Sequence, residues 1–184
     1  MSNLITSPSL ERRIIISRKD CKTEKEYINK LEFISIVNEL ILTDSVQEMK
    51  KYRQHFNTSC FDHCIEVSYW SFLICKKLHL DYISMARGAL LHDLFLYDWR
   101  GSKKRLMLSK CHAFIHPYIA LKNASKICNL NDKEKDIILK HMWPVILLNP
   151  PKYKESFIIT IVDKISCLHS LKNYILKKQD YLFK

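Results

Sequence analysis

Glycine and proline are scarce in this chain, with only 2 glycines and 5 prolines among 184 residues. A turn-rich β-sandwich needs many tight reversals, which draw on these two residues, so their scarcity argues against that class. The long stretches between helix breakers and the 47% apolar content instead favour an all-α fold with a sizeable core. We predict a single-domain helical bundle over residues 23–184, preceded by an extended or partly ordered arm at residues 1–22.

Paired cysteine motifs and long apolar runs are also missing. The 7 cysteines are an odd number and none form a Cys-x-x-Cys pair, which favours reduced thiols over a disulfide framework. The first residues, MSNLITSPSLERR, lack the layout of a secretion signal. Apolar runs such as FIITIV at 157–162 fall far short of the about 20 residues that span a bilayer. We therefore expect a cytoplasmic protein without a membrane helix.

Positive charge is in excess. The 30 Lys and Arg residues outnumber the 19 Asp and Glu residues, for a net charge of +11, and the excess is spread along the chain. This pattern fits a solvated lysine-rich surface, or attraction to phosphorylated small molecules or to nucleic acid. Because no motif of aromatic residues with arginine accompanies the charge, nucleic acid is the less favoured partner. The sequence does not determine the oligomeric state.

Apolar spacing and capping residues predict the helices. A helix over 23–40 is followed by a short one that Asp44 caps and that continues into KKYRQ. Pro117 suits the first position of a later helix. Gly88, inside a predicted helix, indicates close approach of a neighbouring helix. Ser59 with Asp62 approximates a capping box at the start of a helix over 59–78, whose apolar stripe is Cys60, Val67, Trp70 and Ile74. The remaining predicted helices are 82–94, one capped by Asn131 and Glu134, and about 154–176.

Histidines and aspartates fall at positions predicted to face inward on these helices or to end them. A single inward histidine is usually a hydrogen-bonded core residue. Here, however, successive helices each carry such a group, and one shared metal centre would satisfy all of them. The candidate ligands are His63, His92, Asp93, His116, His141 and Asp163.

Imidazole and carboxylate ligands together suit divalent ions such as Mn, Fe, Co, Ni or Zn, and Mg is a further candidate. Six ligands are too many for one ion that keeps an open position. Two ions about 3.5–4 Å apart would instead share a hydroxide nucleophile and clamp a phosphoryl group. The adjacent pair His92 and Asp93 is then the expected catalytic centre, with the carboxylate of Asp93 able to bridge two ions.

The order His63, His92-Asp93 and Asp163 on a helical pattern resembles the HD-domain superfamily of metal-dependent phosphohydrolases. The resemblance covers about residues 55–175. His116, followed by Pro117, and His141 resemble the two additional histidines of members with dinuclear centres. The resemblance implies an all-helical fold, two divalent ions and hydrolysis of a phosphate ester.

The chain also departs from that pattern. Many phosphodiesterases of the superfamily follow the His-Asp pair with Ile-Gly-Lys, whereas this chain has Leu94, Phe95 and Leu96, so a phosphate-binding lysine is absent there. His141 is followed by Met142, where the cyclic-dinucleotide branch often has a second histidine. Candidates for substrate contact are Arg100, Lys103 and His112, although Arg100 and Lys103 fit a solvated loop equally well.

The leading prediction is a phosphohydrolase that acts on a phosphomonoester or phosphodiester, with a nucleotide as the expected substrate. The ligand set also resembles that of the mixed-valent diiron oxygenases of the superfamily. A third alternative is a module that binds a nucleotide without cleaving it. Tyr97 and Trp99 would either stack on a base or close a core.

Overall fold

The computed structural model describes residues 17–55, 58–99 and 106–182, and the fold is all-α as predicted. Its helices are α1 (Glu24–Ile41), α2 (Asp44–Glu48), α3 (Cys60–Lys77), α4 (Tyr82–Leu91), α5 (Leu106–Ile127), α6 (Asp132–Lys140) and α7 (Lys154–Leu182). Two short 3-10 helices, η2 (Arg18–Asp20) and η3 (Met49–Lys51), and an antiparallel pair of strands, β1 (Arg53–His55) and β2 (Thr58–Ser59), complete the described part.

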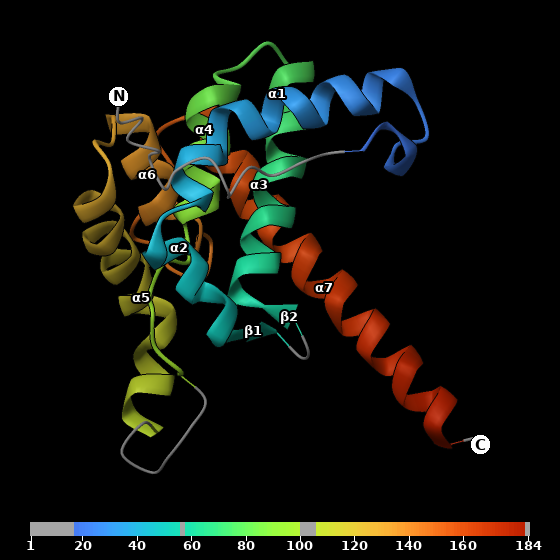
Figure 1. Ribbon diagram of the computed structural model, residues 1–184. Coiled ribbons are helices and arrows are strands. Elements are labelled where there is room, and N and C mark those ends of the chain that lie inside the picture. The colour runs from blue at the N-terminus through green and yellow to red at the C-terminus, as the bar shows by residue number, and fades with distance from the viewer. Residues whose placement is uncertain (1–16, 56–57, 100–105, 183–184) are drawn as a thin grey trace, which may run out of the picture.

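Helix α3 is the central element of the body, with α4 packed along it and α7 running beside it (Figure 1). The helix begins as predicted, because the hydroxyl of Ser59 accepts a hydrogen bond from the backbone N–H of Asp62. Its predicted apolar stripe is partly wrong, since Trp70 is 53% exposed and Ile74 is 37% exposed. The buried face instead includes Ser68, which donates a 2.7 Å hydrogen bond to the carbonyl of Ala86. Small polar side chains on this face let α4 approach closely.

Helices α4 and α6 are also in close contact, and Gly88 is the reason. A Cβ atom placed on Gly88 would lie 3.0 Å from Cγ2 of Ile137 and 3.3 Å from Cα of Glu134. The prediction that this glycine permits a close helix approach is therefore confirmed. Asn131 and Glu134 form the predicted capping box at the start of α6.

Four predicted boundaries were wrong, and one of them is the end of the last helix, which runs to Leu182 instead of about residue 176. Helix α5 spans Leu106–Ile127 with Pro117 in its interior, so this proline does not begin a helix as its preference for the first turn suggested. In the short helix α2, Thr43 and not Asp44 is the N-cap residue, and the helix ends at Glu48. Arg53 and Gln54 lie in strand β1. Helix α4 ends at Leu91, which leaves His92 as its C-cap.

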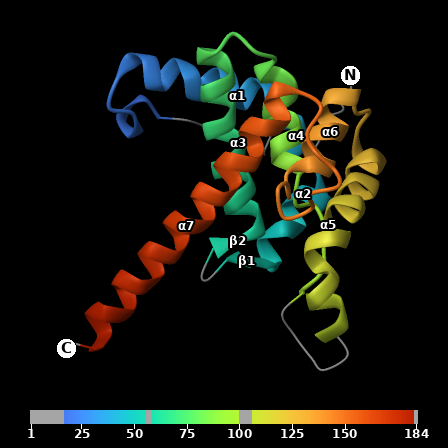
Figure 2. The ribbon, with the colours of Figure 1, turned by 180° about the vertical axis from the view of Figure 1, so that it is seen from behind.

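The last helix and the start of α5 both extend beyond the body (Figure 2). Helix α7 contacts α3, α4, α6 and β1, and Asp163 lies in its first half. Among the described residues, no helix combines the length and apolar character needed to cross a membrane.

Candidate metal centre

Five helices bring the six predicted ligands to one buried place between them. His63 lies in α3, His116 in α5 and Asp163 in α7, whereas the remaining three follow directly after helices. His92 and Asp93 come after α4, and His141 comes after α6. All six side chains are buried. Their predicted inward orientation is therefore observed, while their role as ligands stays a prediction.

One group of donor atoms consists of Asp93, His116 and His141. The two Nε2 atoms of His116 and His141 are 2.8 Å apart. Oδ1 of Asp93 lies 3.2 Å from the first of these nitrogens and 3.5 Å from the second. Neighbouring donors on one divalent ion, at bond lengths of about 2.0–2.1 Å, lie about 2.9–3.4 Å apart. The triangle therefore has the size of a metal site.

Backbone carbonyls set the tautomer of three of these histidines. Nδ1 of His92 lies 2.7 Å from the carbonyl oxygen of Ala89, and Nδ1 of His141 lies 2.8 Å from that of Ile138. Nδ1 of His116 is likewise 2.7 Å from the carbonyl of His112. Since a carbonyl only accepts, Nδ1 carries the proton in each ring, and in the neutral ring Nε2 presents a lone pair to the centre. This is the arrangement that orients metal-binding imidazoles.

The lone pairs of His116 and His141 consequently face each other at 2.8 Å. Two neutral acceptors repel at that distance, so this contact favours a cation between them. A shared proton would satisfy the two nitrogens but not Oδ1 of Asp93, which is buried and makes no hydrogen bond within the described part of the chain. A metal ion would satisfy all three atoms.

The second group consists of His63, His92 and Asp93, and Asp163 lies beside it. Oδ1 of Asp163 is 3.0 Å from Nε2 of His63 and 3.8 Å from Nε2 of His92. On the other side, Oδ2 of Asp93 is 3.3 Å from Nε2 of His92 and 3.9 Å from Nε2 of His63. Each nitrogen therefore lies within 4 Å of two carboxylates.

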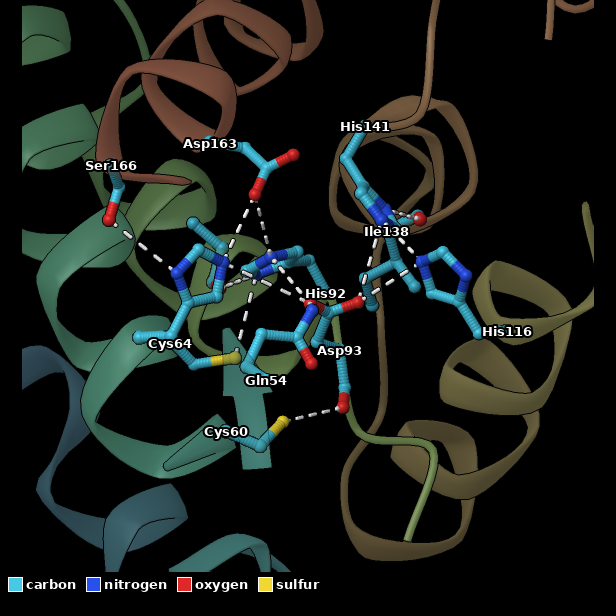
Figure 3. Close-up of polar contacts among 12 residues, drawn as sticks. Gln54, Cys60, Cys64, His92, Asp93, His116, Ile138, His141, Asp163 and Ser166 are labelled. Carbon is cyan, nitrogen blue, oxygen red and sulfur yellow. Dashed lines mark hydrogen bonds and ion pairs between the residues drawn. The ribbon is translucent and has the colours of Figure 1, made fainter. Parts of the chain in front are cut away.

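Asp93 belongs to both groups and directs one oxygen to each. Oδ1 lies toward His116 and His141 (Figure 3). Oδ2 lies toward His63 and His92. This is the geometry of a carboxylate that bridges two ions. The two groups could therefore hold metal ions on either side of Asp93, while the expected number of two divalent ions stays a prediction.

The electrostatics of the buried cluster favour positive charge at its centre. Burial opposes ionisation of Asp93 and Asp163, but the surrounding imidazoles outweigh burial and hold the pKa of each carboxyl well below its usual range. Burial likewise opposes a charge on His92, yet Asp93 and Asp163 raise the pKa of this imidazole well above its ordinary value. The two carboxylates therefore favour positive charge at this place, which a proton on His92 or a bound metal ion could supply.

His141 behaves differently from His92. Burial lowers the pKa of His141 to about 3, and the neighbouring His92 adds to that effect. Its imidazole is therefore neutral near pH 7, which is the form that coordinates metal.

A cavity of about 240 Å³ opens onto this centre. Four of the predicted ligands border it, namely Asp93, Asp163, His116 and His141. Its other walls are formed by Gln54, Trp99, His112, Ala113, Met142, Val145, Lys164 and Cys167. A small ligand in this cavity would reach the predicted ligands directly.

Of the predicted substrate contacts, only His112 lies within the described residues. Its ring stacks between Trp99 and His116, with centroid distances of 4.9 and 4.6 Å, and its Nδ1 lies 2.8 Å from the hydroxyl of Tyr97. His112 therefore borders both the cavity and the centre. Arg100 and Lys103 lie outside the described residues.

Two residues of the site were missed by sequence reasoning. The amide of Gln54, in β1, donates a hydrogen bond to Oδ2 of Asp93. Lys164 follows Asp163 in α7 and lies on the cavity wall. Lys164 could have been found from the sequence, because it is adjacent to the predicted ligand Asp163. No feature of the sequence near Gln54 indicates that this residue belongs to the site.

Comparison with known proteins adds no relative. No family model, no curated protein and no solved structure matches the chain.

Proposed function

We propose that this protein is a metal-dependent phosphohydrolase of the HD-domain type, with two divalent ions, that hydrolyses a phosphate ester such as a nucleotide. The proposal includes membership of the HD-domain superfamily, for which the support is the order of the buried residues along the chain and their convergence. One observation gives this proposal its strongest support. Asp93 aims its two oxygens at two separate pairs of imidazole nitrogens, as a bridging carboxylate does.

His116, His141 and Oδ1 of Asp93 would hold one ion. His63, His92, Oδ2 of Asp93 and Asp163 would hold the other. Bound ions of this kind lower the pKa of water, so that a nucleophile forms near neutral pH, and they offset charge on a phosphoryl group.

The chain's own residues keep this arrangement rigid. Carbonyls of Ala89, His112 and Ile138 hold three imidazoles in the tautomer that leaves Nε2 for the centre. Gln54 holds the shared carboxylate. In the proposed reaction, a water oxygen bonds to phosphorus, the ester P–O bond breaks, and the alcohol leaves with a proton from that water.

The test combines metal analysis with a substrate screen. Protein prepared without chelator is analysed for bound metals, reconstituted with Mn²⁺, Mg²⁺ or Fe²⁺, and screened for phosphate release from nucleotides. We expect about two ions per chain and turnover in the wild type, and loss of both in Asp93→Ala and in Asp93→Asn. Asp132→Ala is the matched control, because the side chain of Asp132 is 84% exposed. Full activity in both Asp93 variants would contradict the proposal.

The same samples separate the alternatives. Oxygen uptake that requires iron, without phosphate release, would favour an oxygenase. Nucleotides that raise the melting temperature without any product would favour a binding module. Turnover with Mn²⁺ under anaerobic conditions excludes the oxygenase reaction as its source.

A further inference from the structure

Lys164 lies on the cavity wall but was not among the substrate-contacting residues expected from the sequence. It is the only lysine or arginine among the described residues that border the cavity. Its Nζ lies 2.7 Å from the carbonyl oxygen of His141 and 3.3 Å from Oδ2 of Asp163. The ammonium group is thus fixed next to one residue from each donor group. About a third of the side chain remains exposed.

The hydrogen-bonding capacity of Lys164 is not exhausted by these contacts. An ammonium group has three N–H donors and no acceptor. The carbonyl of His141 and the carboxylate of Asp163 account for two of them. The third donor is available to a ligand in the cavity that this side chain borders, and an anionic oxygen is its best partner.

The net charge of the metal-loaded site determines whether a phosphomonoester or a phosphodiester is the better-matched substrate. Neutral imidazoles, two divalent ions, the carboxylates of Asp93 and Asp163, and the ammonium of Lys164 leave an excess of about three positive charges. A phosphomonoester carries about two negative charges near neutral pH, and an attacking hydroxide adds one. A phosphodiester carries a single negative charge, so its complex would keep an unbalanced positive charge in a buried site.

We infer that Lys164 binds a phosphoryl oxygen of the substrate and that this site is built for phosphomonoesters rather than phosphodiesters. The inference rests on the proposed function and extends it. Lys164, in α7, would take the place of the phosphate-binding lysine that the chain lacks after Asp93. The organic part of the ester would lie against the apolar wall that includes Trp99, Met142 and Val145.

The first experiment measures kinetics with the Mn²⁺-loaded full chain. The substrates are p-nitrophenyl phosphate and bis(p-nitrophenyl) phosphate, a monoester and a diester with one leaving group. We expect a higher kcat/KM for the monoester. Lys164→Gln should raise KM for the monoester about tenfold or more, because a charge-assisted hydrogen bond is lost, and should leave the metal content at the wild-type level. Lys164→Arg should recover most of the affinity.

A matched control is Lys172→Gln, since Lys172 is an exposed lysine on the same helix. Its kinetics should equal those of the wild type. A merely structural role for Lys164, in holding the carbonyl of His141, would instead lower the bound metal and kcat while KM stays the same. That outcome overturns the inference, as does a diester preference in the wild type.

A second measurement keeps the inference separate from the proposed function. Inorganic phosphate is titrated calorimetrically into the Mn²⁺-loaded wild type and Lys164→Gln. About tenfold weaker binding by the variant supports the phosphate contact even if no ester is ever cleaved, in which case only the hydrolase proposal fails. Equal binding by both proteins overturns the phosphate contact even in an active enzyme.

Discussion

The side-chain amide of Gln54 donates a hydrogen bond to Oδ2 of Asp93, although the two residues are 39 positions apart in the chain. Gln54 lies in the short strand β1, and its side chain is buried beside the shared carboxylate. This contact orients the carboxylate that both donor groups use. Loss of this hydrogen bond should therefore weaken metal binding.

Gln54→Met removes the donor and keeps a side chain of similar length. We expect metal affinity to fall about 10–100-fold, as for other residues that orient ligands, and the free energy of unfolding to fall by about 1.5–3 kcal/mol. Metal titration and denaturant unfolding measure the two effects. Gln47→Met is the control, because the amide of Gln47 donates to the carbonyl of Ile41, away from the centre. Equal metal affinity in both variants would rule out the orienting role.

Replacement of a histidine in only one donor group should remove one ion. His141→Gln should reduce the bound metal from about two ions to about one, because His63, His92, Asp93 and Asp163 still surround the other position. Metal analysis after dialysis gives the stoichiometry. His79→Asn is a suitable control, since His79 is exposed and has a φ of 54°, a backbone conformation that asparagine tolerates. Two ions retained in His141→Gln would contradict the two-group description.

Removal of metal should lower the melting temperature. An ion present at 100 times its dissociation constant stabilises the folded chain by about 2.7 kcal/mol. For a chain of this length that corresponds to about 5–10 °C. A chelator should produce this shift in the wild type but not in Asp93→Ala, which lacks the shared ligand. An identical shift in both proteins would place the stabilising metal elsewhere.

Gly88→Ala should destabilise the fold despite the better helix propensity of alanine. The new methyl group would meet Ile137 Cγ2 at 3.0 Å, and the backbone of Glu134 at 3.3 Å cannot move aside easily. Overpacking costs about 1–3 kcal/mol. Because the contact with the Glu134 backbone does not relax easily, we expect a cost in the upper part of that range, above the about 1 kcal/mol gained in propensity. Ile137→Leu removes Cγ2, so the double variant should lose less than the sum of the single variants. Additive losses in denaturant unfolding would contradict this packing.

Acid should weaken an ion-pair cluster that joins α4, α6 and α7. Nζ of Lys133 lies 3.2 Å from Oδ2 of Asp81 and 2.8 Å from Oε1 of Glu155. Partial burial opposes ionisation of these carboxyl groups, but hydrogen bonds from Ser84 to Asp81 and from Lys133 to both outweigh it and lower both pKa values.

The stabilisation from these carboxyl groups is therefore complete above their unfolded pKa values, about 4, and is lost as the pH falls through the lower folded values. The pKa of Lys133 is raised, since the same two carboxylates outweigh its partial burial, so its own contribution is lost only above about pH 10.5. Melting temperatures from pH 6 to pH 2 should fall less steeply in Glu155→Gln than in the wild type. Asp132→Asn, in an exposed pair, should retain the wild-type slope.

Local signals in the sequence were reliable where a few neighbouring residues decide the outcome. Ser59 and Asn131 cap helices as expected, and Gly88 lies at a close helix contact. The signals failed where packing overrides propensity. Pro117 is accommodated inside α5, and Trp70 lies on the exposed side of α3 because α4 packs on the side with Ser68. Apolar periodicity does not distinguish two adjacent stripes of one helix.

The sequence by itself determined the helical class and the types of donor available, because helix breakers are rare and histidine and aspartate recur at inward or terminal positions of helices. Only the tertiary structure decided which donors meet. Asp163 reaches His63 across 100 residues of chain, and Asp93 divides its oxygens between two pairs of histidines. These distances depend on how five helices pack against one another, and that packing is set by contacts between side chains distant in the chain, which no local pattern records.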